Sequence, residues 1–195
     1  AVLAIASGGP ALGLTGVTPW RYPAQDAPDG FVPLAALTLA ALARLGAGPD
    51  LAGDMAEAGE ALRAQQANLR GESPVRANPA KRMAGQLMNR YAVCFVADEL
   101  APAGRWWQGQ INQLAKAWAQ CVPLAEADHA LAGRLLPEPL IDKYLTLFLR
   151  GAAPSAAMDE VRLGFMTAGY NTDMIAGPGR SRLAQALTLA HYGSY

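Results

Sequence analysis

The densest group of side chains capable of chemistry is the stretch R-W-W-Q-G-Q-I-N-Q-L-A-K-A-W, residues 105–118. It contains three of the four tryptophans and four side-chain amides, but no acid. A carboxamide binds polar groups, yet it cannot accept and return a carbon-bound proton at neutral pH. The stretch is therefore either a helix packed into a core with amides at its rim, or a helix that holds an active-site group.

Apolar periodicity favours the first interpretation. Trp107, Ile111, Leu114 and Trp118 recur at i, i+4, i+7 and i+11, which predicts one buried stripe on a helix over residues 101–120. The opposite side gathers polar residues, namely Arg105, Gln108, Asn112 and Lys116. Gln110 and Gln113 lie on a flank between the two, three residues apart.

His129 is the main candidate for proton transfer. It ends the stretch E126-A-D-H129, so two carboxylates lie close to it in sequence and would raise the pKa of its imidazole. A lone histidine is more often structural, and both roles stay open from the residues alone. His191, among Leu187, Ala190 and Tyr192, is predicted to be structural.

Two glycine-containing loops could approach a ligand. Ser7-Gly8-Gly9 follows a short apolar run, and Gly177-Pro178-Gly179 precedes a predicted helix whose free N–H groups would favour an anion. Neither has the spacing of a Walker A or dinucleotide fingerprint. The alternative is that both are turns that need unusual backbone angles.

Composition excludes several classes of protein. The chain has 195 residues, 52% of them hydrophobic, and a formal net charge of zero without a basic patch, so we expect a globular protein that does not bind nucleic acid. The apolar run 31–45 is too short for a membrane span. Cys94 and Cys121 are expected to be buried thiols in a reducing compartment, and no His/Cys cluster has zinc spacing.

The order of predicted elements indicates an α/β fold with a parallel sheet and helices on both faces. Strands are expected at residues 2–6, 91–97, 121–124, 140–149 and 172–176, and helices at 32–45, 50–70, 79–90, 101–120, 155–168 and 180–195. Residues 15–28, which contain three prolines, are predicted to be a rigid loop, and 71–77 a linker. Both ends read as internal to a fold, so we expect a part of a longer chain.

Several motifs resemble one family. Arg105-Trp106, then Q110-I-N-Q-L-A-K116 and E126-x-x-H129, resemble the second SIS (sugar isomerase) domain of the bifunctional phosphoglucose/phosphomannose isomerases, whose members read Gln-x-Asn-Glu-Asn-Ala-Lys. N78-P-A-K81, G179-x-S-x-L-A-Q-x-L and I5-A-S-G-G9 resemble further segments in the same order. The resemblance implies SIS-type folding, with residues 1–70 from the end of a first SIS domain and 78–195 a second one.

The resemblance also implies an activity, namely aldose–ketose isomerisation of a hexose phosphate by a cytoplasmic homodimer without a metal or other cofactor. His129 would assist ring opening, and Ser7, Gly8 and Gly9 would contact the substrate. Two departures matter. The catalytic glutamate of the family falls on Gln113, and an arginine of its Gln-Pro-Arg element falls on Leu34. Glu126 is the nearest remaining carboxylate. The alternative is a sugar-phosphate-binding module without catalysis, or a dimer scaffold.

Overall fold

The computed structural model describes residues 2–22, 31–127 and 138–195, and the chain divides into two compact units, Ala1–Met55 and Ala56–Tyr195. His129 lies outside the described residues. Within the described ranges, no helix is long and apolar enough to cross a bilayer.

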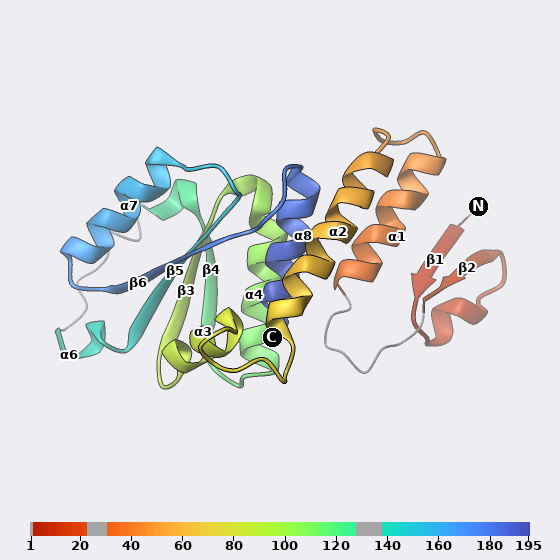
Figure 1. Cartoon of the computed structure of the whole chain (residues 1–195). Helices are drawn as coiled ribbons and strands as arrows, with labels where there is room; N and C mark the ends of the chain where they lie inside the picture. The colour runs from red at the N-terminus through yellow and green to blue at the C-terminus, as the bar shows by residue number, and fades with distance from the viewer. Residues whose placement is uncertain (1, 23–30, 128–137) are drawn as a thin grey trace. The chain divides into compact units, whose positions relative to one another are not determined.

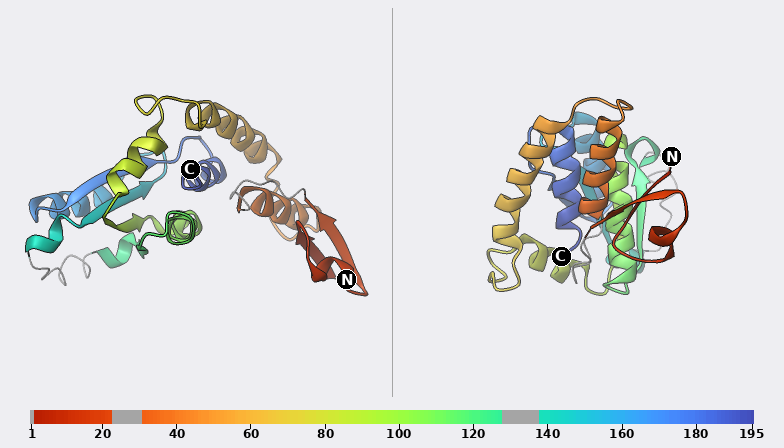
Figure 2. Two further views of the ribbon diagram at one scale, coloured as in Figure 1. Left: turned by 90° about the horizontal axis from the view of Figure 1, so that it is seen from below. Right: turned by 90° about the vertical axis from the view of Figure 1, so that its right-hand side faces the viewer.

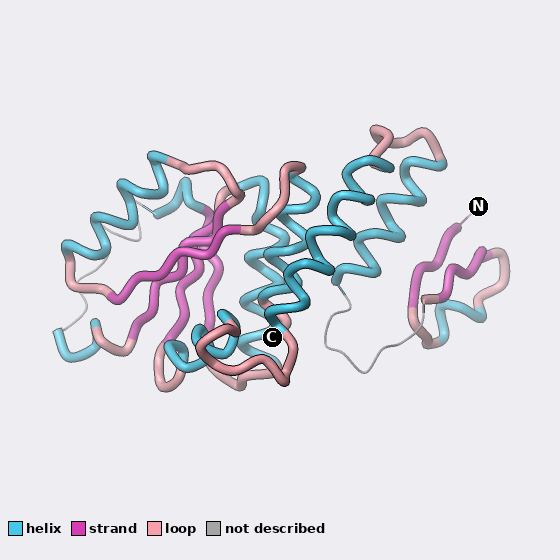
Figure 3. Tube along the Cα trace, in the orientation of Figure 1, coloured by secondary structure: helices cyan, strands magenta, loops and turns pink. Residues whose placement is uncertain are grey.

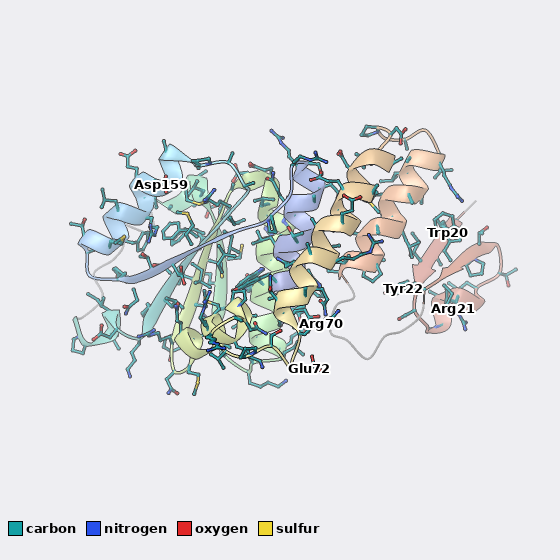
Figure 4. The ribbon with its side chains drawn as sticks, in the orientation of Figure 1. Trp20, Arg21, Tyr22, Arg70, Glu72 and Asp159 are labelled. Atoms are coloured by element: carbon teal, nitrogen blue, oxygen red, sulfur yellow. The ribbon has the colours of Figure 1, made fainter. Side chains whose placement is uncertain are left out.

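The first unit contains a small parallel sheet and a helix (Figure 1). Strand β1 (Val2–Ala6) pairs with β2 (Val17–Arg21), and α1 (Phe31–Arg44) follows. The prediction of a loop over 15–28 is wrong at β2. Pro19 is accommodated because β2 pairs along one side only, as proline requires in a sheet. Figure 4 shows Trp20 on β2, and the Arg44 guanidinium lies 6.0 Å from the centre of its ring.

The second unit is an α/β domain in which helices and strands alternate along the chain (Figure 3). Helix α2 (Ala52–Leu69) begins just before this unit, and the elements that follow are α3 (Pro79–Leu87), β3 (Tyr91–Val96), η2 (Asp98–Leu100), α4 (Ala101–Gln113), β4 (Ala119–Pro123), η3 (Leu124–Glu126), α6 (Glu138–Ile141), β5 (Tyr144–Arg150), α7 (Ala156–Thr167), β6 (Asn171–Ala176) and α8 (Arg182–Tyr192). The strands form a parallel sheet in the order β4-β3-β5-β6.

Helices cover both faces of this sheet, which confirms the predicted fold class (Figures 1 and 2). On one face Phe95 and Phe148 pack against Phe165 of α7. The neighbouring residues of the same strands, such as Cys94 and Leu147, point to the other face because strand side chains alternate. That face is covered by α4 and α8.

The predicted end of the tryptophan helix is wrong. Helix α4 ends at Gln113, and residues 119–120 belong to β4. Trp107 and Ile111 are buried as predicted, whereas Leu114 and Trp118 are 54% and 68% exposed. Lys116 adopts a left-handed φ of 53°, which turns the chain back toward the sheet and breaks the helical periodicity.

The segment predicted as a linker, residues 71–77, is a series of turns held by the chain that follows it. Asn78 Nδ2 donates to Arg70 O over 3.1 Å, and Lys81 Nζ donates to Ser73 O over 2.9 Å. Asn78 also caps α3, since its side chain accepts from the N–H of Lys81. Two residues of the Asn-Pro-Ala-Lys motif thus fix where helix α3 begins.

Candidate functional site

Two tryptophans of α4 hold this helix against α8. Trp107 Nε1 donates to Leu189 O over 2.7 Å and its ring stacks on Tyr192 with centroids 5.3 Å apart. Trp106 Nε1 donates to Ser194 Oγ over 3.0 Å. Burial and satisfied N–H groups are typical of structural tryptophans. The interpretation of Trp107 as core is confirmed.

Two of the side-chain amides on α4 accept hydrogen bonds from backbone N–H groups of the edge strand β4. Gln108 Oε1 accepts from Cys121 N over 3.1 Å, and Asn112 Oδ1 accepts from Ala119 N over 2.7 Å. Residues four apart on a helix are about 6 Å apart, and alternate strand residues about 6.6 Å, so the two spacings match. β4 is an edge strand, and its outward N–H groups would otherwise be open to another strand. These amides are therefore structural.

The other two side-chain amides of α4, Gln110 and Gln113, do not bond to β4 and differ from each other in exposure. Gln113, the position of the family's glutamate, is the last residue of α4 and is exposed. Gln110, one turn earlier, is only 7% exposed, and its Oε1 has no hydrogen-bond partner within the described parts of the chain. Sequence periodicity did not single out Gln110, because a flank position gives no sign of burial.

Gln113 and Glu126 lie at opposite ends of the sheet. α4 begins after the carboxyl end of β3 and ends before the amino end of β4, whereas Glu126 follows the carboxyl end of β4 (Figure 1). The five residues of β4 separate these ends by about 17 Å at 3.3 Å per residue. Glu126 therefore cannot replace, within one chain, a base lost at position 113.

The carboxyl edge of the sheet carries an acidic hollow. Its volume is about 770 Å³, and its lining includes Asp98, Glu99, Ser155 and Glu160. Three carboxylates in one hollow oppose binding of a phosphate, although they suit sugar hydroxyls or a cation. Within the described residues, however, no three His, Cys, Asp or Glu side chains are grouped so that they could hold a metal ion.

The anion position predicted at Gly177-Pro178-Gly179 is filled by the chain itself. Glu57 of α2 accepts from the backbone N–H groups of Arg180 and Ser181, the latter over 2.9 Å. These bonds, with the nearby Arg180 guanidinium, lower the pKa of the Glu57 carboxyl. Because Glu57 is far from this helix in sequence, no local pattern could have revealed the contact.

Packing requires the glycines of that loop. A Cβ at Gly177 would lie 2.3 Å from the carbonyl oxygen of Gln185, and Gly179 has a φ of 128°. These residues let the loop lie on α8, which supports the turn interpretation.

The loop Ser7-Gly8-Gly9 in the first unit, unlike Gly177-Pro178-Gly179, has open space around both of its glycines. Gly9 has a φ of 98°, so glycine is favoured there by backbone angle, and a Cβ at Gly8 would meet no atom within 4 Å. All three residues are exposed at the end of β1. The backbone is therefore accessible to a ligand.

Neither thiol is poised as a nucleophile. Cys94 and Cys121 lie side by side in register on β3 and β4, and both are free. Burial raises the pKa of both thiols, that of Cys94 strongly, so the reactive thiolate is disfavoured at neutral pH. Cys94 is buried as predicted, and Cys121 is half-buried.

A protein-family comparison explains the architecture. The model of the C-terminal SIS domain of bacterial phospho-glucose isomerase matches residues 76–195. The chain belongs to this family. This confirms the resemblance seen in the sequence and indicates a phosphosugar isomerase-like or sugar-binding function for the SIS domain.

Solved structures support the same fold. A glucose-6-phosphate isomerase-like protein from Thermus thermophilus is 21% identical, with a TM-score of 0.61, and the match covers 71% of this chain and 48% of that one. A hypothetical protein from the same organism is 13% identical, with a TM-score of 0.62, covering 92% and 51%. The chain thus spans about half the length of each. No curated protein matches it in sequence.

Proposed function

We propose that this SIS-family chain is part of a phosphosugar isomerase-like protein that binds a hexose phosphate, such as glucose, mannose or fructose 6-phosphate. The observation that carries the proposal is the family match over residues 76–195. In the proposed organisation, residues 1–70 are the end of a first SIS domain, 71–77 a connection and 78–195 the second SIS domain. The parent protein would be a cytoplasmic homodimer.

The proposed substrate contacts are Ser7, Gly8 and Gly9, and the proposed ring-opening group is His129. Support for the first three comes from their exposure and from the backbone freedom at Gly9. Gln113 would contact the substrate in place of a glutamate, and its exposure at the end of α4 leaves it accessible. No cofactor is required, since isomerisation through an enediol only moves protons.

The amide at Gln113 lowers the isomerase turnover that we expect. Proton transfer between C1 and C2 needs a group that takes the proton from one carbon and returns it to the other, and an amide has no such basicity at neutral pH. General acid–base catalysis contributes about 10² to 10⁴-fold, so we expect turnover lower by about this factor than with a glutamate. A sugar-phosphate-binding module without catalysis is the second candidate, and a dimer scaffold the third.

The test is restoration of the acid in the parent protein. Gln113→Glu should raise conversion of fructose 6-phosphate, and adding His129→Ala should lower it again. Gln120→Glu, the same change at an exposed position on β4, is the matched control and should leave conversion unchanged. Equal rates in the Gln113→Glu and Gln120→Glu variants would contradict the assignment of Gln113.

Binding is tested separately from turnover. Saturating fructose 6-phosphate should raise the melting temperature of the unaltered protein, since a ligand at 100 times its Kd stabilises the folded state by about 2.7 kcal/mol. Stabilisation without turnover would favour the non-catalytic module. A melting temperature that no hexose phosphate changes would leave only the scaffold.

A further inference from the structure

A second concave site lies at the amino edge of the sheet in the second unit. This amino-edge pocket is open to solvent, has a volume of about 1070 Å³, and is lined by α3, the end of α4, the end of α8 and the residues that lead into β3, β4 and β5. Small-molecule pockets typically measure about 300–1,000 Å³. The pocket therefore has the size of a binding site, and the family's SIS match does not assign it a ligand.

Its walls are largely apolar and aromatic. Trp107 and Ile111 of α4 are buried beneath it, Met83 of α3 is buried beside them, and Tyr192 of α8 adds a ring that stacks on Trp107. Burial raises the pKa of the Tyr192 hydroxyl to about 12, so this wall is uncharged at neutral pH. The apolar lining that remains exposed includes Leu114 and Trp118, at 54% and 68%. A hexose phosphate, polar on all sides, would leave these two side chains without complementary contacts, whereas an apolar ring or alkyl chain would bury them.

Charge around the pocket has one sign. Its lining includes Arg90, Lys116 and Lys143, and none of the lining residues is acidic. The three cations come from the segments before β3, before β4 and before β5, so they surround the opening from different elements. Clefts with charges of one sign attract ligands of the other. An occupant should therefore carry a negative charge at the rim.

One buried amide in the wall has an unmet hydrogen bond. Gln110 lines the pocket, is 7% exposed, and its Oε1 lacks a partner in the described part of the chain. Buried polar atoms are usually paired, and each exception needs an explanation. The two ends of a carboxamide have nearly the same shape, so a half-turn of this group exchanges its donor and its acceptor.

We propose that the amino-edge pocket binds a small organic anion with an aromatic or alkyl body and a hydrogen-bond donor. The apolar body contacts the exposed lining residues Leu114 and Trp118, the donor reaches Gln110, and the acid group lies among Arg90, Lys116 and Lys143. Leu114, next to Gln113, belongs to the pocket lining, but Gln113 itself does not, and neither do Ser7, Gly8 or Gly9. The probe titrations below do not depend on turnover, so either proposal can fail without the other.

The test uses two probes that differ in charge. Anilinonaphthalene sulfonate has an apolar body, an N–H donor and an acid group, and N-phenyl-1-naphthylamine has the same rings and N–H without the acid. Fluorescence titration of the full chain should give saturable binding of the sulfonate, and binding of the neutral probe about tenfold weaker. Equal affinity for the two probes would overturn the proposal.

Variants locate the binding. Ala84→Trp, at an exposed position of the pocket lining on α3, should abolish sulfonate binding, and Ala115→Trp should do so from the α4–β4 connection. Ala64→Trp, the same change at an exposed position of α2 outside the lining, is the control and should bind like the unaltered chain. Undiminished binding in both pocket variants, with circular dichroism unchanged, would overturn the proposal.

Charge is tested on the same surface. Arg90→Gln combined with Lys143→Gln should weaken sulfonate binding about tenfold and leave the neutral probe unaffected. Arg63→Gln with Arg70→Gln removes two cations outside the lining and should change neither probe. Displacement of the sulfonate by fructose 6-phosphate would place the sugar in this pocket and overturn the separate assignment.

Discussion

Replacing Asn112 with alanine should destabilise the second unit although this side chain is exposed. Asn112 Oδ1 accepts from Ala119 N over 2.7 Å, and its Nδ2 lies 3.4 Å from Ala119 O. Ala119 is 2% exposed, so the substitution leaves a backbone N–H without water or partner. An unsatisfied buried donor costs about 1–3 kcal/mol. Alanine regains about 0.5 kcal/mol of helix propensity, which leaves a net loss of about 1.5 kcal/mol.

The matched control is the next residue. Gln113→Ala removes a similar amide from the same helix, but that side chain is exposed, and exposed substitutions usually change stability by less than about 0.5 kcal/mol. Asn112→Asp keeps the acceptor for Ala119 N and should retain most of the stability.

The assay is urea unfolding followed by tryptophan fluorescence. Trp20 is the one tryptophan of the first unit, so a Trp20→Phe background confines the signal to Trp106, Trp107 and Trp118 of the second. Hydrogen exchange of the Ala119 amide should accelerate in Asn112→Ala alone. Equal unfolding free energies for Asn112→Ala and Gln113→Ala would refute the view that this amide protects the edge strand.

Two further substitutions test the contacts of α8. Gly193→Ala should destabilise the domain by about 1–3 kcal/mol in thermal unfolding, because its Cβ would lie 2.6 Å from the Trp107 ring; Gly109→Ala, in open space on α4, should be neutral or stabilising. Glu57→Gln should weaken the pH dependence of stability. The folded-state pKa of Glu57 is below its ordinary value of 4.5, so its carboxylate stabilises the fold above about pH 5 and loses this effect as pH falls through the folded pKa. Urea midpoints that fall equally in both proteins between pH 6 and pH 3 would argue against the Glu57 contact with Ser181.

Several elements could be predicted from sequence because their signals are local. The runs at 2–6 and 91–97 are apolar and of strand length, and both are strands within one residue of the predicted ends. The Asn-Pro-Ala-Lys motif contains the cap and first turn of α3, and its start is correct. By contrast, the strand expected from residue 140 begins at Tyr144, because its first residues form the short helix α6.

In the candidate site, too, some features could be predicted from the sequence and others depend on packing. Absence of an acid at Gln113 is a property of the sequence and needs no coordinates. Gln113 is exposed and Gln110 is buried because of the way α4 packs against its neighbours. Both residues lie on the flank of the helix between its apolar and polar sides, so their positions in the sequence do not predict this difference. The pairing of Gln108 and Asn112 with alternate residues of β4 could have been anticipated from their i, i+4 spacing, but only if β4 were known to be the edge strand.

The sequence by itself determined the alternating α/β order, the SIS resemblance and the replacement of the family's glutamate, because apolar periodicity and motif identity are carried by neighbouring residues. Tertiary structure alone decided where α4 ends, that Glu57 occupies the anion position at the start of α8, and that cations from three separate connections surround one pocket. These features arise where segments distant in the chain exchange hydrogen bonds and charge, and no local pattern encodes such partners.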